Sequence, residues 1–429
     1  MSQNVFQTDI VVIGGGPAGA TCATLLAQAG HAVVLLERDR FPRFQIGESL
    51  LPYNNDLFRR MGLLDALGEG KFLPKYGAHF VTGDGRTGYT FRFDKNLAEE
   101  YSRSFQVSRA RFDELLLRHA ESRGVDVRED TSVADVDVSS SDRATIRGTS
   151  ADGQPFELTA RFVVDATGAR SLLASKNGGR LENEKLKKVS FFAHYKGVTP
   201  GGEGRDAGNT VIALLKNAWI WMIPIDEETT SVGLVVDRDE FLASGLKPEE
   251  LLDKTIACTP YVAGRMGQAV RSSQVYARKD FSYRAKKMVG NNFALIGDAA
   301  GFIDPIFSTG VFMAMKSAEV AADAVALRLR NGSTRLLRSY EKRMSTALKK
   351  YMMFIENFYR REFLEVFLQP SERFGLIPAV VGVLAGNVFE RTRDRGKLAL
   401  FFFLVWLQKN RGIIAPRIRW DRLPAAARS

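Results

Sequence analysis

The chain contains little cysteine or histidine and no long apolar run. Of 429 residues, two are cysteine and four are histidine. Cys22 and Cys258 lie far apart without metal-ligand spacing, so we expect neither a disulfide framework nor a metal site. The longest apolar run, Leu398 to Leu407, is well short of the roughly 20 residues that a membrane-spanning helix needs. We therefore expect no transmembrane segment, and we expect this run to pack internally.

Composition and charge are those of an ordinary globular enzyme in all but one region. The apolar share is 45% and the charged share 25%, and no basic-then-apolar leader pattern precedes the first predicted strand. We expect a cytoplasmic enzyme of two or three domains with no nucleic-acid partner. Residues 331–429 hold 19 Lys and Arg against 8 Asp and Glu, which accounts for the whole net charge of +11. This excess fits either an acidic partner or solvated helical faces.

The order of the patterns predicts an α/β fold, α+β overall. A β-branched run at residues 8–13, a glycine turn, a helix to Ala29 and a second strand ending at Glu37 form a βαβ unit. Further strands of the same type recur near residues 160–168 and 292–300, too far along for one continuous domain. We predict a glutathione-reductase-like FAD-binding domain with an inserted β-sheet substrate domain and a helical C-terminal part. The predicted boundaries are 1–75, 106–174 and 286–330 for the FAD-binding domain, 76–105 and 175–285 for the substrate domain, and 331–429 for the helical region.

Three glycines between the first strand and the first helix carry a dinucleotide signature. Gly14, Gly16 and Gly19 form G-x-G-x-x-G, which makes a tight turn and lets the backbone approach a pyrophosphate at the helix N-terminus. Glu37 ends the second strand, where an acid accepts hydrogen bonds from a ribose 2′-hydroxyl. The strand context and Glu37 together predict dinucleotide binding.

Two later segments of the sequence indicate that the dinucleotide is FAD and not NAD. The segments Asp165-Ala166-Thr167-Gly168 and Gly297-Asp298-Ala299 resemble the second and third signatures of the flavoprotein hydroxylases. That resemblance implies that Asp298 holds the ribitol chain and that Arg109, in SRARFD, lies near the flavin. We also assign Ser49 and Gly310 to the cofactor site. No second G-x-G-x-x-G unit follows that could seat NAD(P)H.

Three further segments, in order, resemble the flavin-dependent halogenases. Residues 219–224 match W-x-W-x-I-P, although Ala218 stands where the family usually has glycine. Residues 302–310 match F-x-x-P-x-x-S-x-G. Lys75, in PKYGAHF, stands where these enzymes carry an essential lysine, and Lys71 is its nearby competitor. The resemblance covers roughly residues 8 to 315.

The resemblance implies a chemistry for each segment. These enzymes make hypohalous acid from chloride or bromide, oxygen and FADH2, and the amine of Lys75 would capture or orient it, by hydrogen bond or as a haloamine. The resemblance also implies catalysis by Ser308 and halide binding by the Thr309 and Gly310 amides. Trp219, Trp221 and Pro224 would shield the flavin. Core packing is an equally good account of the two tryptophans, and the two roles are compatible.

The same motif indicates the substrate branch. Tryptophan halogenases carry a glutamate immediately before Ser-Thr-Gly to take the ring proton, and here that residue is Phe307. The chain is therefore closer to the phenol- and pyrrole-type halogenases, whose substrate is an aromatic small molecule or a ring on an acyl or peptidyl carrier protein. His79 is a candidate base for a phenol, although a structural role is more typical of a histidine in this position.

Electron supply and two other functions stay open at this point. With one dinucleotide fingerprint, electrons must come from transient NAD(P)H docking or from a separate flavin reductase. An aromatic hydroxylase or reductase would use the same FAD scaffold, but Lys75 and the paired tryptophans argue against it. A non-catalytic FAD-bound redox sensor is the alternative from another class.

Overall fold

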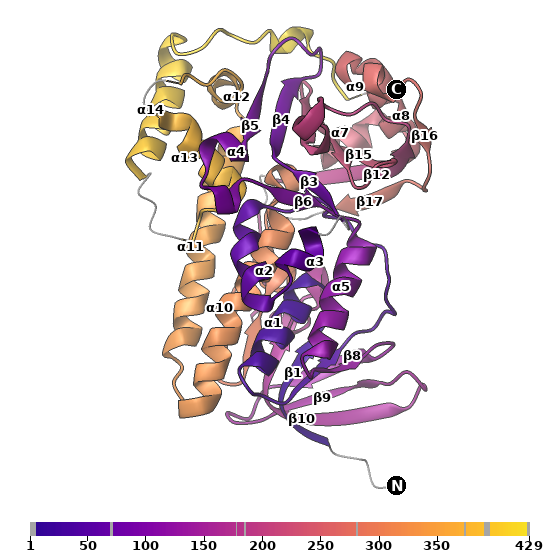
Figure 1. Cartoon of the computed structure of the whole chain (residues 1–429), viewed down its shortest axis with the longest axis vertical. Helices are drawn as coiled ribbons and strands as arrows, with labels where there is room; N and C mark the ends of the chain where they lie inside the picture. The colour runs from indigo at the N-terminus through magenta and orange to yellow at the C-terminus, as the bar shows by residue number, and fades with distance from the viewer. Residues whose placement is uncertain are drawn as a thin grey trace.

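The computed structural model describes residues 6–68, 72–176, 178–183, 186–279, 282–372, 375–389 and 395–426. Lys71, the competitor of Lys75, lies outside these residues. Two large sheets and a set of long helices make up the described chain (Figure 1). The N-terminal sheet lies at the bottom of that view, the second sheet at the upper right, and the C-terminal helices at the upper left.

The first sheet forms where the β-branched runs predicted strands. In the described residues it is seven-stranded, ordered β7-β2-β1-β10-β9-β8, with β19 paired to β10. β1 runs parallel to β2 and β10, which is the pairing that a βαβ unit requires. Its strands are β1 (Phe6–Ile13), β2 (Val33–Leu36), β7 (Asp126–Arg128), β8 (Ser132–Asp137), β9 (Ala144–Thr149), β10 (Pro155–Asp165) and β19 (Phe293–Leu295).

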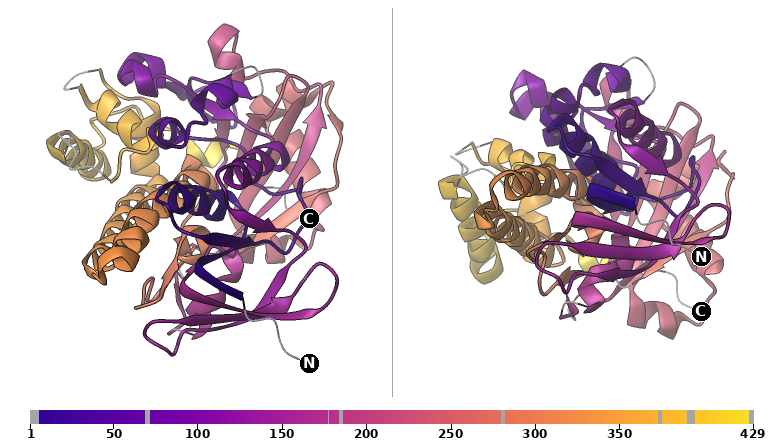
Figure 2. Two further views of the ribbon diagram at one scale, coloured as in Figure 1. Left: turned by 60° about the horizontal axis from the view of Figure 1, so that its bottom comes forward. Right: turned by 90° about the horizontal axis from the view of Figure 1, so that it is seen from below.

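Four helices pack around this first sheet. The helix α1 (Pro17–Gln28) packs against both α5 (Arg109–Ser122) and α10 (Thr309–Asn331), and α11 (Arg335–Phe358) packs on α10. Figure 2 shows α10 and α11 as two long antiparallel helices beside α1. Because α10 begins at Thr309, the S-T-G motif of residues 308–310 lies at the N-terminus of this helix. Short helices complete this part: α2 (Asn55–Met61), α3 (Leu64–Gly68) and α6 (Leu172–Lys176).

The second sheet is eight-stranded in the described residues, ordered β16-β12-β15-β14-β13-β4-β5, with β17 paired to β12. The helices α7 (Arg238–Ser244), α8 (Pro248–Cys258) and α9 (Pro260–Met266) belong to this part. Alternate residues of β14 face two different cores: Trp219 and Trp221 pack with the FAD-binding part, Ile220 and Met222 with a separate cluster. The strands are β4 (Gly77–Thr82), β5 (Gly88–Arg92), β12 (Lys188–Lys196), β13 (Thr210–Leu214), β14 (Ala218–Pro224), β15 (Thr229–Asp237), β16 (Val270–Arg271) and β17 (Tyr276–Lys279).

Two small sheets and a last helix layer join these parts. The β3 (Leu73–Lys75) and β6 (Ser104–Gln106) pair brings Lys75 opposite Ser104. A three-stranded sheet contains β11 (Arg180–Glu182), β18 (Tyr283–Ala285) and β20 (Gly301–Phe302). The short α4 (Phe93–Asn96) contacts α13 (Leu376–Ala385), which packs with α14 (Arg395–Arg411) in the C-terminal layer. The helix α14 also packs with α12 (Arg361–Leu368).

Two details of the helical region differ from expectation. The helical pattern of the sequence runs without a break from residue 341 to 368 and predicts one helix there, but α11 ends at Phe358 and α12 begins at Arg361. The run at residues 398–407 packs internally on one side only, because Phe403 is 51% and Trp406 56% exposed. In the described residues, no helix has the length and apolar character needed to cross a bilayer.

Candidate active site

The glycine turn forms a cradle against the strand β10. Gly14 has φ of 105°, and a Cβ there would clash with the carbonyl oxygen of Ala166. A Cβ on Gly19 would clash with the carbonyl oxygen of Gly14. The carboxylate of Asp165 accepts hydrogen bonds from the amides of Thr167 (3.0 Å) and Leu173 (2.7 Å), so it holds the turn that carries Ala166. Only glycine permits this close approach of α1 and two strands.

Charged side chains surround the opening of this cradle. Glu37 accepts from the Gly15 amide at 2.6 Å and from the Asp39 amide at 2.9 Å. Arg43 lies beside Gly16, where its guanidinium would meet an added Cβ at 3.4 Å. A cation at the first turn of α1 suits a bound pyrophosphate. Sequence reasoning missed Arg43 because it belongs to no quoted motif.

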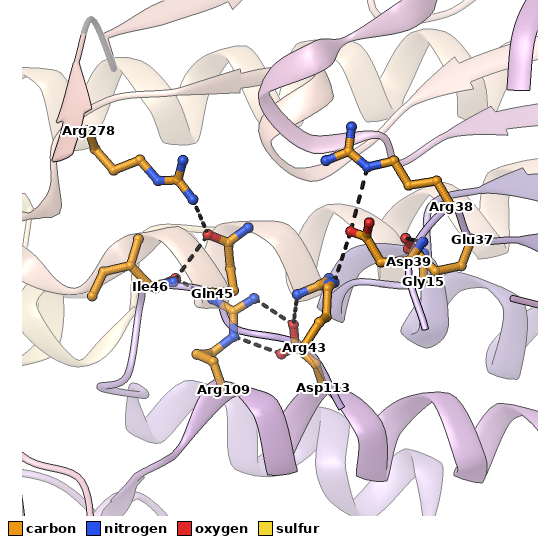
Figure 3. Close-up of polar contacts among 10 residues, drawn as sticks. All are labelled: Gly15, Glu37, Arg38, Asp39, Arg43, Gln45, Ile46, Arg109, Asp113 and Arg278. Atoms are coloured by element: carbon orange, nitrogen blue, oxygen red, sulfur yellow. Dashed lines mark hydrogen bonds and ion pairs between the residues drawn. The ribbon is translucent and has the colours of Figure 1, made fainter. Parts of the chain in front are cut away.

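Asp113 holds both arginines of this region (Figure 3). Arg109 donates to its two carboxylate oxygens, from Nε at 2.7 Å and from Nη2 at 2.8 Å. Arg43 donates to Asp113 Oδ2 at 3.1 Å. Arg109 also donates to the carbonyl oxygen of Ile46, and Gln45 joins that loop to Arg278 at 2.9 Å. The α5 helix begins at Arg109, so its first turn fixes the loop that follows Glu37.

Asp298 lies in a turn after β19. Burial raises the pKa of its carboxyl to about 6, against the opposing effect of Arg109. In the described residues its carboxylate has no protein hydrogen-bond partner, whereas its carbonyl oxygen accepts from the Tyr283 hydroxyl at 2.9 Å. An unpaired carboxylate at this position fits the hydroxyls of a flavin's ribitol chain. The glycine cradle, Glu37, Arg43 and Asp298 together fit FAD.

Lys75 is buried at a junction of the two parts. Its side chain is 2% exposed, and its Nζ donates to Ser49 Oγ at 2.8 Å and to the carbonyl oxygen of Leu50 at 3.1 Å. Ser49 Oγ continues to Thr210 Oγ1 at 3.0 Å. Burial lowers the pKa of the Lys75 ammonium to about 7, because the described residues offer it no carboxylate partner. The amine is thus partly neutral at neutral pH.

A small apolar cavity opens beside Lys75. Its volume is about 20 Å³, room for about one water molecule. None of the described residues that line it is acidic. Phe307 lies where tryptophan halogenases have glutamate, and its ring packs edge-on against Phe358 with centroids 5.3 Å apart. The lining residues are Leu51, Lys75, Ala78, Phe80, Phe91, Phe93, Thr210, Ile212, Ile306, Phe307, Ser308 and Leu384.

The S-T-G motif joins this cavity to a helix N-terminus. Ser308 lines the cavity and has φ of 55°, a left-handed conformation, and its side chain does not cap α10. Thr309 and Gly310 open the helix, so their amides have no intrahelical acceptor. The structure therefore brings Lys75 and Ser308 to one cavity with free backbone donors beside it.

The two tryptophans make different hydrogen bonds on one face of β14. Trp219 Nε1 donates to the Tyr359 hydroxyl at 3.1 Å, and Trp221 Nε1 donates to Ser231 Oγ at 3.1 Å. Tyr359 in turn donates to Asp304 Oδ2 at 3.0 Å. Asp304 also accepts from the Ile306 amide at 2.9 Å, and burial raises the pKa of its carboxyl to about 6. Tyr359 thus joins the tryptophan strand to the S-T-G loop.

One predicted residue, His79, does not line the cavity, and one buried acid, Glu48, was not predicted. His79 Nδ1 is 2.8 Å from Thr90 Oγ1, and His79 is not among the described cavity residues. Glu48 was missed: it is buried next to Ser49, and its Oε1 is 2.6 Å from His194 Nε2. Its position in the sequence, directly before the predicted Ser49, was the available signal. In the described residues, no group of His, Cys, Asp and Glu is placed to hold a metal ion.

Comparison with known proteins decides the family. Residues 7–355 match a family model described as an FAD binding domain. The chain is 30% identical over 408 residues to the 1H-pyrrole-2-carbonyl-[peptidyl-carrier protein] chlorinase of Pseudomonas fluorescens, covering 90% of each chain. This chain belongs to the flavin-dependent halogenases. The halogenase is also 32% identical over 320 residues to the corresponding brominase of Pseudoalteromonas luteoviolacea, covering 74% of this chain and 77% of that one.

Solved structures agree with this assignment. The halogenase matches the myxobacterial chondrochloren halogenase CndH with a TM-score of 0.80 and 32% identity, over 95% of this chain and 91% of that one. It matches the flavin-dependent brominase Bmp2 with a TM-score of 0.84 and 27% identity, over 94% and 99% of the two chains. The predicted family, the α/β fold with a helical C-terminal part, and the use of FAD and a halide are confirmed. The halogenase is an FAD-dependent oxidoreductase.

Proposed function

We propose that the halogenase installs chlorine or bromine on a pyrrole or phenol ring carried by a peptidyl or acyl carrier protein. The observation that carries this proposal is a buried amine, Lys75, in an aromatic-lined cavity whose described lining residues include no acid. A ring presented at this wall finds no carboxylate to take its proton, so it must be activated by its own heteroatom, as pyrroles and phenols are. The two relatives named for a pyrrole ring on a peptidyl carrier protein support the tethered form.

We assign the cofactor contacts to the polar region around the glycine cradle. Gly14, Gly16 and Gly19 would accept the pyrophosphate against α1 with Arg43 beside it, and Glu37 would bind the ribose. Asp298 would bind the ribitol, and Arg109 would hold the Ile46 loop at the cofactor site. Reduced FAD supplies the electrons with which oxygen converts a halide to hypohalous acid. A separate flavin reductase would deliver it, because the sequence holds one dinucleotide fingerprint.

Lys75 would handle the halogen. A neutral amine takes the halogen of hypohalous acid as an electrophile and releases water, and its lowered pKa makes that form available near pH 7. Ser49 and the Leu50 carbonyl oxygen hold Nζ at the cavity wall. Ser49 thus supports Lys75, in addition to the cofactor role predicted for it. The Thr309 and Gly310 amides would bind the halide, and Ser308 would contact the reacting groups from the same wall.

The tryptophan face would keep substrate from the flavin. Trp219, Trp221 and Pro224 come from β14, and both indole rings pack in the core shared with the FAD-binding part. This placement allows the tryptophans both to pack in the core and to shield the flavin.

We also propose the predicted division of the chain at residues 75, 105, 174, 285 and 330, which the two large sheets support.

The test uses bromide, FAD and a separate flavin reductase, with products read by mass spectrometry. The substrates are a pyrrole-2-carbonyl-loaded carrier protein, the same ring as a free ethyl amide, a phenol and tryptophan. We expect brominated pyrrole or phenol, much less brominated tryptophan, and no turnover with NADH when the reductase is left out. Efficient tryptophan bromination would overturn the substrate class. Rapid NADH oxidation by the halogenase alone would overturn the separate reductase.

A further inference from the structure

The outer face of α14 carries exposed aromatic side chains between basic ends. Phe403 is 51% and Trp406 56% exposed, and their rings stack with centroids 5.7 Å apart. Ala399 and Asn410 extend the same exposed stripe by one helical turn in each direction. Soluble proteins seldom leave two large aromatic rings together in water, because their apolar area is costly to hydrate. This exposed stripe is therefore a candidate contact surface.

The opposite face of α14 is firmly packed, so the exposure is not that of a loosely attached helix. Phe401 packs edge-on against Phe363 of α12, with centroids 5.4 Å apart, and Phe402 against Phe354 of α11 at 5.1 Å. Gln408 Nε2 donates to buried Glu365 at 2.7 Å. Figure 1 shows α14 at the outer edge of the molecule, with α13 between it and α4. The aromatic pair is thus presented outward on a fixed support.

Charge selects among the possible occupants of this face. Arg395 begins the helix, and Lys409 and Arg411 end it; all three are exposed, and none forms an ion pair within the described chain. Residues 331–429 as a whole carry the entire net charge of +11. A second copy of this chain would bring like charges together, whereas an acidic partner would neutralise them.

The surface is one helix layer from the cavity of Lys75. The helix α14 packs on α12 and α13. Phe367 of α12 contacts Phe80 and Phe91 of the cavity wall, with centroids 5.0 and 4.5 Å apart, and Leu384 of α13 lines the cavity. A partner seated on α14 would therefore be separated from the cavity of Lys75 only by the helices α12 and α13.

We infer that Phe403 and Trp406, with Arg395, Lys409 and Arg411, form the docking surface for an acidic carrier protein that presents the ring. This inference rests on the proposed function. The aromatic pair supplies buried apolar area at the centre of the contact, and the basic ends set orientation and attract the partner. The ring substrate itself touches none of these five residues.

The test compares the intact halogenase with two α14 variants, Phe403→Ser/Trp406→Ser and Lys409→Glu/Arg411→Glu. The matched controls are Leu242→Ser, which replaces a 66% exposed leucine on α7, and Lys254→Glu on α8. The probes are the pyrrole-2-carbonyl-loaded carrier protein and the same ring as a free ethyl amide. We expect each α14 variant to lower kcat/KM for the loaded carrier by about tenfold or more, with unchanged kcat/KM for the free amide. The salt dependence should weaken in the charge variant alone.

Each other outcome is decisive. Unchanged carrier turnover in both α14 variants overturns the docking surface and leaves the proposed function intact. Halogenation of the free amide, without turnover or binding of the loaded carrier by the unaltered enzyme, overturns the tethered substrate and the docking surface together. A wild-type dimer that becomes monomeric in the Phe403→Ser/Trp406→Ser variant, with carrier turnover unchanged, assigns the face to a second copy. Equal losses for the carrier and the free amide overturn the docking surface, because they assign these residues to the support of the fold and not to the partner contact.

Discussion

The cradle around Gly14 and the cavity around Lys75 differ in how they treat charge: the cradle pairs charged side chains, and the cavity isolates one amine. At the cradle, buried Asp113 pairs with buried Arg109 and half-buried Arg43, so each of these three charges has a partner of opposite sign. At the cavity, a single amine has only neutral hydrogen-bond partners among the described residues, the Ser49 hydroxyl and the Leu50 carbonyl oxygen, and burial lowers its pKa. Pairing keeps charges fixed for holding a charged cofactor, whereas isolation removes a charge and leaves a nucleophile. The cradle is therefore suited to binding the cofactor, and the cavity is suited to chemistry at the amine.

The largest expected effect comes from removing the amine. In Lys75→Ala, halogenated product should fall by about a hundredfold or more, a loss typical of removing an acid–base or nucleophilic group. Lys75→Arg should fail as well, because a guanidinium stays protonated. FAD affinity and the reoxidation of reduced FAD by oxygen should stay near normal, since the cradle is untouched. Stopped-flow absorbance measures the reoxidation of reduced FAD, and mass spectrometry measures the halogenated product. Product formed at more than a tenth of the wild-type rate would contradict the role of Lys75.

The opposite variant should damage the cradle and spare the amine. Asp113→Ala leaves the buried Arg109 without its carboxylate, which costs about 3 kcal/mol of unfolding free energy. FAD affinity should fall, while enzyme saturated with FAD should still halogenate. Urea unfolding and FAD titration measure these effects. The exposed pair of Asp126 and Arg128 supplies the control, because Asp126→Ala should change stability by less than about 1 kcal/mol.

The pH dependence separates two ways in which Lys75 could act. Because the pKa of the Lys75 ammonium is lowered to about 7, the neutral amine increases as pH rises through 7. We expect the rate of halogenation, at saturating reduced FAD, to rise over pH 6 to 8 and then level. A rate that falls over this range would mean that the ammonium form of Lys75 acts, by donating a hydrogen bond to hypohalous acid.

The same shift has a consequence for stability. The folded pKa lies below the unfolded value, so the unfolded chain binds the extra proton between about pH 7 and 10.5. Unfolding free energy should therefore rise with pH across this window. Lys75→Met should remove that slope and should be more stable than wild type near pH 7. A slope that persists in Lys75→Met would come from other groups.

Much of this comparison could be predicted from the sequence, because the motifs are local. The G-x-G-x-x-G turn, the helix that begins at Thr309 and the two tryptophans on one strand each depend on neighbours a few residues away. Tyr359 could not be found in this way: it lies 140 residues from Trp219 and 55 from Asp304 in the chain. Arg43 likewise meets Asp113 only through the fold.

The exposed side of α14 was missed for a different reason. The run of ten apolar residues from Leu398 to Leu407 has no polar face, so its periodicity predicts burial all round. The sequence cannot show that only Phe401, Val405 and Gln408 find a buried place on the neighbouring helices. Which side a uniformly apolar helix buries is decided by what is available to pack against it.

The smallest expected effect lies at the link between the two regions. Tyr359→Phe removes the hydroxyl between Trp219 and Asp304, so Asp304 loses a donor and the pKa of its carboxyl should rise above about 6. We expect a loss of halogenation of about three- to tenfold, equivalent to leaving one buried polar group unpaired. The loss should be greatest at acid pH, with FAD affinity unchanged. A uniform loss at all pH values would mean that Tyr359 acts only in packing.

The left-handed backbone of Ser308 limits how this enzyme can be altered by random mutagenesis. With φ at 55°, position 308 tolerates glycine or asparagine far better than valine or isoleucine, whose branched Cβ is strained there. A saturation library at this position should therefore return its folded members from a handful of small residues, whatever chemistry is selected. Variation of the neighbouring Phe307, whose backbone is not restricted in this way, should offer the wider range of functional sequences.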